Sequence, residues 1–80
     1  MFYVYIIKSL KNPNKSYIGF TKDLKKRLES HNAQKSLFSR KYAPWELESC
    51  IEFKSEEKAR SFERYLKSGS GHAFFRKHLI

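Results

Sequence analysis

The chain opens with an apolar run, a turn-rich stretch and a second apolar run. Residues 2–7 are apolar at every position, which predicts a central strand covered on both faces. Residues 9–15 contain Pro13 among serine, asparagine and lysine residues, and residues 16–20 are again largely apolar. The order strand, turn formers, strand predicts a β-hairpin at the start of the chain.

The pairing register of this hairpin decides which side chains share a face. In one register Tyr5 lies directly opposite Tyr17 and Tyr3 opposite Gly19, and all four residues then lie on the same face. A slip of one residue on either strand would put the two tyrosines on opposite faces. In the expected register two phenols meet beside a glycine without a side chain, an arrangement suited to docking a ligand.

A basic helix is predicted directly after the hairpin, over residues 22–32. Thr21 is a suitable N-cap, and Asp23 would lie in the positive first turn. Arg27 and His31 are one turn apart and border the apolar stripe of this helix. Both side chains therefore lie close to the face that packs on the sheet.

The middle of the chain predicts a loop and then an edge strand. Residues 33–43 are polar and basic, which is typical of a loop. After Pro44 the pattern alternates over residues 45–53, as in a half-exposed strand at a sheet edge. The alternation places five residues on one face: Trp45, Leu47, Ser49, Ile51 and Phe53.

Two helices are predicted in the last third of the chain. Ser55 is a suitable N-cap for a helix that runs to about Ser68, and the stretch from Gly69 to Gly71 would end it. The core stripe of this helix is Ala59, Phe62 and Leu66, and a last short helix holds Phe74, Phe75 and Leu79. The order β-β-α-β-α-α predicts an α/β (α+β) fold, with a small three-stranded antiparallel sheet flanked by helices.

Chain length and net charge indicate the number of domains and the class of binding partner. The chain has 80 residues, so we expect one small domain over residues 1–80. It carries 17 lysine and arginine residues against 8 acidic residues, for a formal charge of +9. An excess of this size favours a polyanionic partner, most often nucleic acid, over solubility alone.

Cysteine usage and hydropathy suggest a location. Cys50 is the single cysteine, so no disulfide can form within the chain, which is typical of a reducing compartment. The first apolar run is too short to span a membrane and lacks the features of a signal peptide. We therefore expect a cytoplasmic protein without a membrane partner.

Five positions in order resemble a known family. Tyr3-Val4-Tyr5 followed by Ser16-Tyr17-Ile18-Gly19 resembles the paired signature of the GIY-YIG nuclease superfamily, and its small stand-alone bacterial members in particular. Arg27 and His31 fall on the following helix, as that family's arginine and histidine do, and Glu63 falls where the family has its metal-binding glutamate. The chain departs from the pattern at Tyr3, which replaces the first glycine, and in residues 68–80, which lack the asparagine of many members.

The resemblance implies a metal-dependent DNA endonuclease or nickase that hydrolyses phosphodiester bonds. It implies that Glu63 binds Mg²⁺ or Mn²⁺ and that Arg27 contacts a phosphate, whereas His31 could assist proton transfer or hold a phosphate. It also implies that one tyrosine acts as general base while the other orients it, and we favour Tyr5 as the base. A free phenol has a pKa of about 10 and is therefore a poor base at neutral pH. We expect the neighbouring cations, Arg27 and the metal, to lower the pKa of the tyrosine that acts as base.

The residues alone allow other interpretations. Glu63 and Lys67 have the spacing of an exposed helical ion pair, and Arg27 could be a solvated helix arginine. His31 lies where a helix dipole favours a cation, and two tyrosines can simply pack across a hairpin. The alternative function is a nucleic-acid-binding module that keeps the fold without the chemistry.

Basic residues outside the site would give affinity for DNA without sequence readout. In so short a chain we expect specificity to be low or supplied by a partner protein. The candidates for nucleic-acid contacts are Lys26, Lys35, Arg40, Lys41, Arg60, Arg64, Lys67, Arg76 and Lys77.

Overall fold

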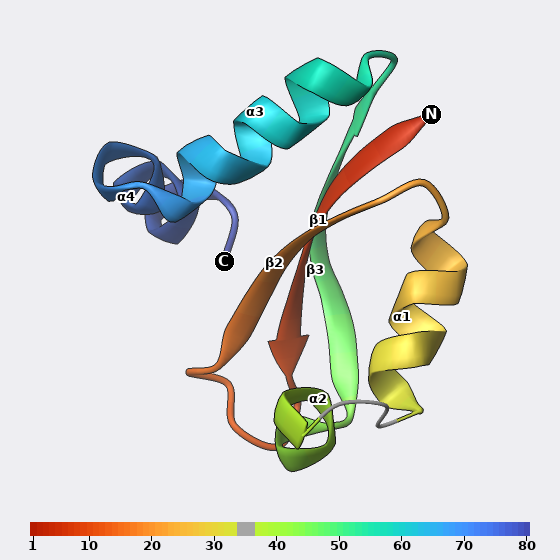
Figure 1. Cartoon of the computed structure of the whole chain (residues 1–80). Coiled ribbons are helices and arrows are strands. Elements are labelled where there is room, and N and C mark those ends of the chain that lie inside the picture. Colours follow the sequence, from red (N-terminus) through yellow and green to blue (C-terminus); the bar gives the residue numbers. More distant parts are fainter. Residues whose placement is uncertain (34–36) are drawn as a thin grey trace.

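Three antiparallel strands form the sheet of this computed structural model, which describes residues 1–33 and 37–80. The strands are β1 (Phe2–Ser9), β2 (Ser16–Thr21) and β3 (Trp45–Phe53), and their order is β2-β1-β3 (Figure 1). The predicted antiparallel sheet is therefore confirmed, with the apolar run in the centre and the alternating strand at an edge. Residues 4–7 are all buried, as expected for a strand covered on both faces.

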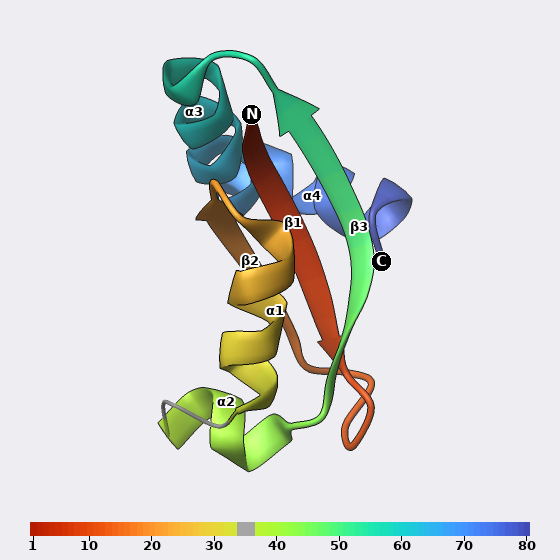
Figure 2. The ribbon, with the colours of Figure 1, turned by 90° about the vertical axis from the view of Figure 1, so that its right-hand side faces the viewer.

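Helices cover both faces of this sheet. Figures 1 and 2 show α1 (Leu24–Asn32) on one face and α3 (Glu56–Lys67) with α4 (Gly69–His78) on the other. The predicted α+β fold and the order of its longer elements are confirmed. The predicted loop before β3 is wrong in part, because it contains the short helix α2 (Leu37–Tyr42).

Alternation along β1 divides the core into two layers. Val4 and Ile6 pack on the face that α3 and α4 cover. Tyr5 and Ile7 point to the α1 face, where Trp45 packs against them. Tyr5, the candidate catalytic residue of β1, thus faces α1, while its neighbours Val4 and Ile6 pack in the layer under α3 and α4.

The hairpin register differs from the expected one by two residues. Tyr5 pairs with Gly19, and Tyr17 pairs with Ile7. Strand β1 extends beyond its apolar run to Ser9, which is buried. The Ser9 hydroxyl donates to the Tyr42 carbonyl and accepts from the Asn12 amide at 2.9 Å, so the buried polar group is satisfied. A shift of two keeps side chains on the same face, so the two tyrosines still meet.

A bulge in β3 makes the prediction of five residues on one face wrong. Ile6 pairs with Ser49 and Ile7 with Leu47, so Glu48 is an extra residue in the strand. The bulge turns Trp45 to the tyrosine face, while Ile51 and Phe53 pack against the α3 face. Three glutamates are exposed along this edge strand: Glu46, Glu48 and Glu52.

The helix caps confirm one prediction and correct another. Ser55 caps α3 as predicted, since its side chain accepts from the Lys58 amide at 3.2 Å. For α1 the N-cap is Asp23 and not Thr21, because Asp23 accepts from the Lys26 amide at 3.0 Å. The Thr21 hydroxyl instead accepts from the Asp23 amide at 3.1 Å and so shapes the turn before the helix.

The glycines after α3 do not form a separate terminator. Ser68 is both the C-cap of α3 and the N-cap of α4, so Gly69 and Gly71 lie in the first turn of α4. Gly71 is buried, and a Cβ atom there would collide with the Tyr65 carbonyl oxygen. A side-chain-free residue is therefore required where the two helices cross.

Gly71→Ala should destabilise the protein by about 1–3 kcal/mol, because the added methyl meets backbone and something must shift. The matched control is Gly69→Ala, where no atom lies within 4 Å of the new Cβ. Since alanine is the better helix former, this control should leave the stability unchanged or raise it slightly. Urea unfolding of both variants checks this; equal midpoints would contradict the close packing of α3 on α4.

Candidate active site

A cluster of four rings lies on the α1 face of the sheet. The Tyr5 hydroxyl and His31 Nε2 are 3.0 Å apart, within hydrogen-bonding distance. The His31 ring centroid lies 5.0 Å from that of Tyr17 and 6.3 Å from that of Trp45. Residues from β1, β2, the end of α1 and β3 are thus brought together around one histidine.

The Tyr5 phenol lies deep in this cluster. Tyr5 is only 1% exposed, and its ring fills the space where Gly19 has no side chain. Burial and the neighbouring Tyr17 raise the pKa of Tyr5 to about 12, although the Arg27 guanidinium lowers it through its charge and a hydrogen bond. The expected lowering of this pKa is therefore wrong, because loss of solvation outweighs the neighbouring cation.

The environment of His31 favours its neutral form. Burial and the Arg27 charge lower the pKa of His31 below its ordinary 6.5. A neutral ring with its proton on Nδ1 can accept a hydrogen bond from the Tyr5 hydroxyl at Nε2, which fits the 3.0 Å contact. The interpretation of His31 as a helix-end cation is not supported, since that role would favour the charged form.

A cleft opens beside this cluster at the β2 edge of the sheet, between α1 and α3. Its volume is about 930 Å³. Tyr17, Arg27 and Glu63 all line it, whereas Tyr5 does not. The remaining lining residues are Phe20, Thr21, Lys22, Asp23, Lys26, Glu29, Ser30, Ala33 and Arg60.

Glu63 forms the ion pair expected from its spacing and also lines the cleft. Its Oε2 accepts from Lys67 Nζ at 3.0 Å, so the predicted helical ion pair is present. The Glu63 side chain is nevertheless only 19% exposed, lines the cleft and acts electrostatically on Tyr5. An ion pair on one oxygen leaves a second carboxylate oxygen for another contact.

The donor set of the cleft suits a hard, strongly hydrated cation. Among the described residues no group of three or more histidine, cysteine, aspartate or glutamate side chains could hold a metal ion. Mg²⁺ commonly binds through one or two carboxylates and keeps several of its waters. Glu63, with one carboxylate on an open cleft, fits that mode of binding and does not fit an enclosed all-protein site.

The model of the GIY-YIG catalytic domain family matches residues 1–76, which is nearly the whole chain. The chain belongs to the GIY-YIG family. Comparison with curated proteins returned no match.

Family membership places this GIY-YIG domain among nuclease domains, whose substrate is nucleic acid. Within the described residues no helix has the length and apolar character needed to cross a membrane. The five residues that carried the resemblance are brought to one region: the Tyr5–His31 pair lies in the cluster, and Tyr17, Arg27 and Glu63 line the cleft.

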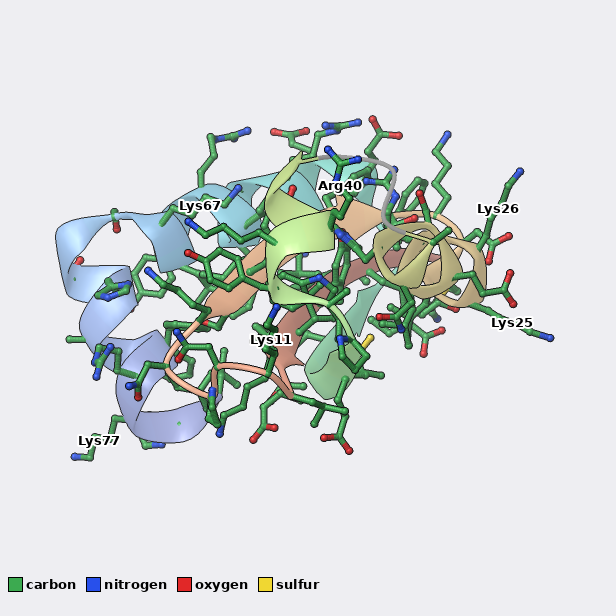
Figure 3. The ribbon with its side chains drawn as sticks, turned by 90° about the horizontal axis from the view of Figure 1, so that it is seen from below. Lys11, Lys25, Lys26, Arg40, Lys67 and Lys77 are labelled. Carbon is green, nitrogen blue, oxygen red and sulfur yellow. The ribbon has the colours of Figure 1, made fainter. Side chains whose placement is uncertain are left out.

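The predicted nucleic-acid contacts of this GIY-YIG domain are more widely spread. Lys26 lines the cleft, and Lys67 is paired with Glu63. Figure 3 shows Lys26, Arg40 and Lys67 along the upper side of the view, from α1, α2 and α3 respectively. Lys41 and Arg64 are exposed outside the cleft, and Lys35 lies outside the described residues.

Asn32 is a residue of this GIY-YIG domain that the sequence did not single out. Its side-chain amide donates to the Trp45 carbonyl at 3.0 Å, and its carbonyl accepts from the Trp45 amide at 2.6 Å. These two bonds tie the end of α1, and with it His31, to the first residue of β3. No local pattern marks this role, because the partner is backbone in a distant strand.

Protonation of His31 should lower the unfolding free energy of the protein as the pH falls below about 6.5. Its folded pKa lies below the ordinary 6.5, so the unfolded chain binds more protons in that window. The stability contributed by the neutral ring is present above pH 6.5 and is lost as pH falls towards the folded pKa. We expect the difference in unfolding free energy between wild type and His31→Gln to shrink over that window.

Urea unfolding across a pH series measures this difference, and NMR titration locates the His31 pKa directly. A pKa at or above 6.5 would contradict the buried, neutral ring.

Proposed function

We propose that this GIY-YIG domain is a metal-dependent endonuclease or nickase that hydrolyses phosphodiester bonds in DNA. The observation that carries the proposal is the convergence of Tyr17, Arg27 and Glu63 on one cleft, backed by the buried Tyr5–His31 pair. A phenol, a guanidinium and a carboxylate are the groups needed to handle a proton, a phosphate and a cation.

The burial of the two phenols favours Tyr17 over Tyr5 as general base. Tyr5 is 1% exposed with its pKa raised to about 12, so it is protonated at neutral pH and out of reach of bulk water. Tyr17 is half-buried and lines the cleft. We therefore replace the initial preference for Tyr5: Tyr17 accepts the proton of the attacking water, and Tyr5 orients the groups around it.

Tyr5 acts through its two partners. Its hydroxyl donates to neutral His31 and accepts from Arg27, so it holds both side chains in place. Arg27, fixed in this way, presents its guanidinium to a phosphate in the cleft. Lys26 on the same wall adds a phosphate contact without base recognition.

Glu63 would hold the Mg²⁺ or Mn²⁺ ion of this reaction. When bound, the ion supplies charge stabilisation for the phosphate and the leaving oxygen. The Lys67 ammonium restricts the rotamers of the Glu63 side chain, since one carboxylate oxygen is already bonded. Glu63 thereby serves the cation while the basic side chains serve the DNA backbone.

Glu63→Ala should abolish cleavage and leave DNA affinity equal to or above that of the wild type, because Lys67 is released from its ion pair. The loss of stability should be small, about 0–1 kcal/mol, as Lys67 is half exposed. The matched control is Glu57→Ala, which removes an exposed carboxylate from the first turn of the same helix.

The assay follows supercoiled, branched and single-stranded DNA with Mg²⁺, Mn²⁺ or EDTA. Cleavage by Glu63→Ala at the wild-type rate would refute the metal role of Glu63.

Tyr17→Phe should lower the single-turnover cleavage rate by about 10²–10⁴-fold, the usual contribution of general acid–base assistance. The ring remains, so packing in the cluster and DNA affinity should be retained. Tyr5→Phe should lower the rate by a smaller factor, because the buried Tyr5 hydroxyl positions His31 and Arg27 and does not accept the proton of the water.

Single-turnover rates of both variants separate the two phenols. If Tyr5→Phe lowers the rate more than Tyr17→Phe does, Tyr5 is the base. If the wild type cuts no DNA with either metal, the binding-module alternative replaces the enzyme.

A further inference from the structure

The C-terminal end of the chain carries a charged surface that the cleft does not include. From residue 64 to residue 80 the sequence contains no aspartate or glutamate. The end of α3 contributes Arg64, whereas Lys67 is paired with Glu63 of the cleft; the last turn of α4 contributes Arg76, Lys77 and His78. This segment therefore presents positive charge without acidic residues of its own.

Exposed rings lie within this basic segment. Tyr65 on α3 is 42% exposed and Phe74 on α4 is 39% exposed, and their ring centroids are 6.4 Å apart. The Phe74 and His78 centroids are 4.9 Å apart, which extends the row along α4. We call the exposed row of Tyr65, Phe74 and His78 the aromatic surface.

The aromatic surface is separate from the cleft. Glu63 lines the cleft, and Tyr65 follows it by two positions, which places Tyr65 roughly 200° further round the helix. Neither Tyr65 nor Phe74 lines the cleft. The Tyr65 ring contacts Phe62 at the margin of the core, with 6.1 Å between the ring centroids, but it remains 42% exposed. Neither ring belongs to the candidate active site.

Charge decides which partner suits this surface. A second copy of the chain would bring the same cations against each other, which opposes self-association. Unpaired nucleotides offer flat bases for the rings and a phosphate for each neighbouring cation, and stacking accepts any base. Lys77 lies one turn from Phe74, within reach of a phosphate next to a stacked base.

We propose that the aromatic surface binds unpaired nucleotides, with bases stacked on Tyr65 and Phe74 and phosphates contacted by Lys77 and its basic neighbours. The site adds a binding function beyond cleavage and does not depend on the active-site chemistry. Bases in a duplex are already stacked on one another, so this surface discriminates single-stranded from double-stranded nucleic acid.

The test measures binding of a short labelled oligothymidine and of a matching duplex by fluorescence anisotropy, in EDTA. Tyr65→Leu and Phe74→Leu keep an apolar side chain and remove the ring, whereas Tyr65→Phe keeps the ring. Leu10→Ala is the matched control, because Leu10 is 57% exposed on the hairpin loop. Circular dichroism checks that each variant is folded.

Each leucine variant should bind the single strand roughly 5-fold or more weakly, with duplex affinity unchanged. The slope of log affinity against log salt should stay the same for these variants, since no cation is lost, and should become shallower for Lys77→Gln. Tyr65→Phe and Leu10→Ala should bind as the wild type does.

Wild-type affinity of both leucine variants for the single strand would overturn the proposal, as would an equal loss on the duplex. Sedimentation adds a third adverse outcome: a wild-type dimer that Phe74→Asp dissociates, with single-strand affinity of Phe74→Leu intact, assigns the surface to a second copy. Glu63→Ala should bind the single strand at least as tightly as the wild type, so failure of the cleavage mechanism leaves this result readable.

Discussion

The site of this GIY-YIG domain depends on the close approach of the Tyr5 ring to the backbone at Gly19. Because the two residues pair across the hairpin, any side chain at position 19 would occupy the space that the ring fills. The ring can therefore lie flat across β2, where its hydroxyl reaches His31 on α1. The absence of a side chain at Gly19 thus allows the contact between the hairpin and α1, the helix whose residues form one wall of the cleft.

Much of the fold follows from local pattern. The apolar run of residues 4–7 had to be central, and Ser55 had to start a helix, because each has one physical solution at short range. The hairpin register and the β3 bulge did not follow. The hairpin register is accompanied by the hydrogen bond from the buried Ser9 hydroxyl to the Tyr42 carbonyl. The bulge appears in the pairing of Ser49 and Leu47 with adjacent residues of β1. Both are contacts between residues far apart in the sequence.

The candidate site divides in the same way. Spacing could place Arg27 and His31 on one helix face, and the resemblance could add Glu63, but neither could rank the two phenols. The ranking proposed above rests on burial, since the pKa of Tyr5 is raised by desolvation more than the Arg27 charge lowers it. The role of Asn32 could not be predicted from the sequence. Its side-chain amide pairs with the backbone N–H and C=O of Trp45 as a peptide group would, and no local pattern indicates such a contact.

The two edges of the sheet differ in charge. At the β2 edge the cleft is lined by four cations, Lys22, Lys26, Arg27 and Arg60, and by three carboxylates, Asp23, Glu29 and Glu63. The β3 edge exposes three carboxylates, Glu46, Glu48 and Glu52. Such an asymmetry gives the molecule an electric moment across the sheet in addition to its net charge. The β3 edge is therefore the side of the sheet that a polyanion approaches least favourably. The same glutamates also discourage strand addition at this open edge, because a second strand would have to bury or approach their charges.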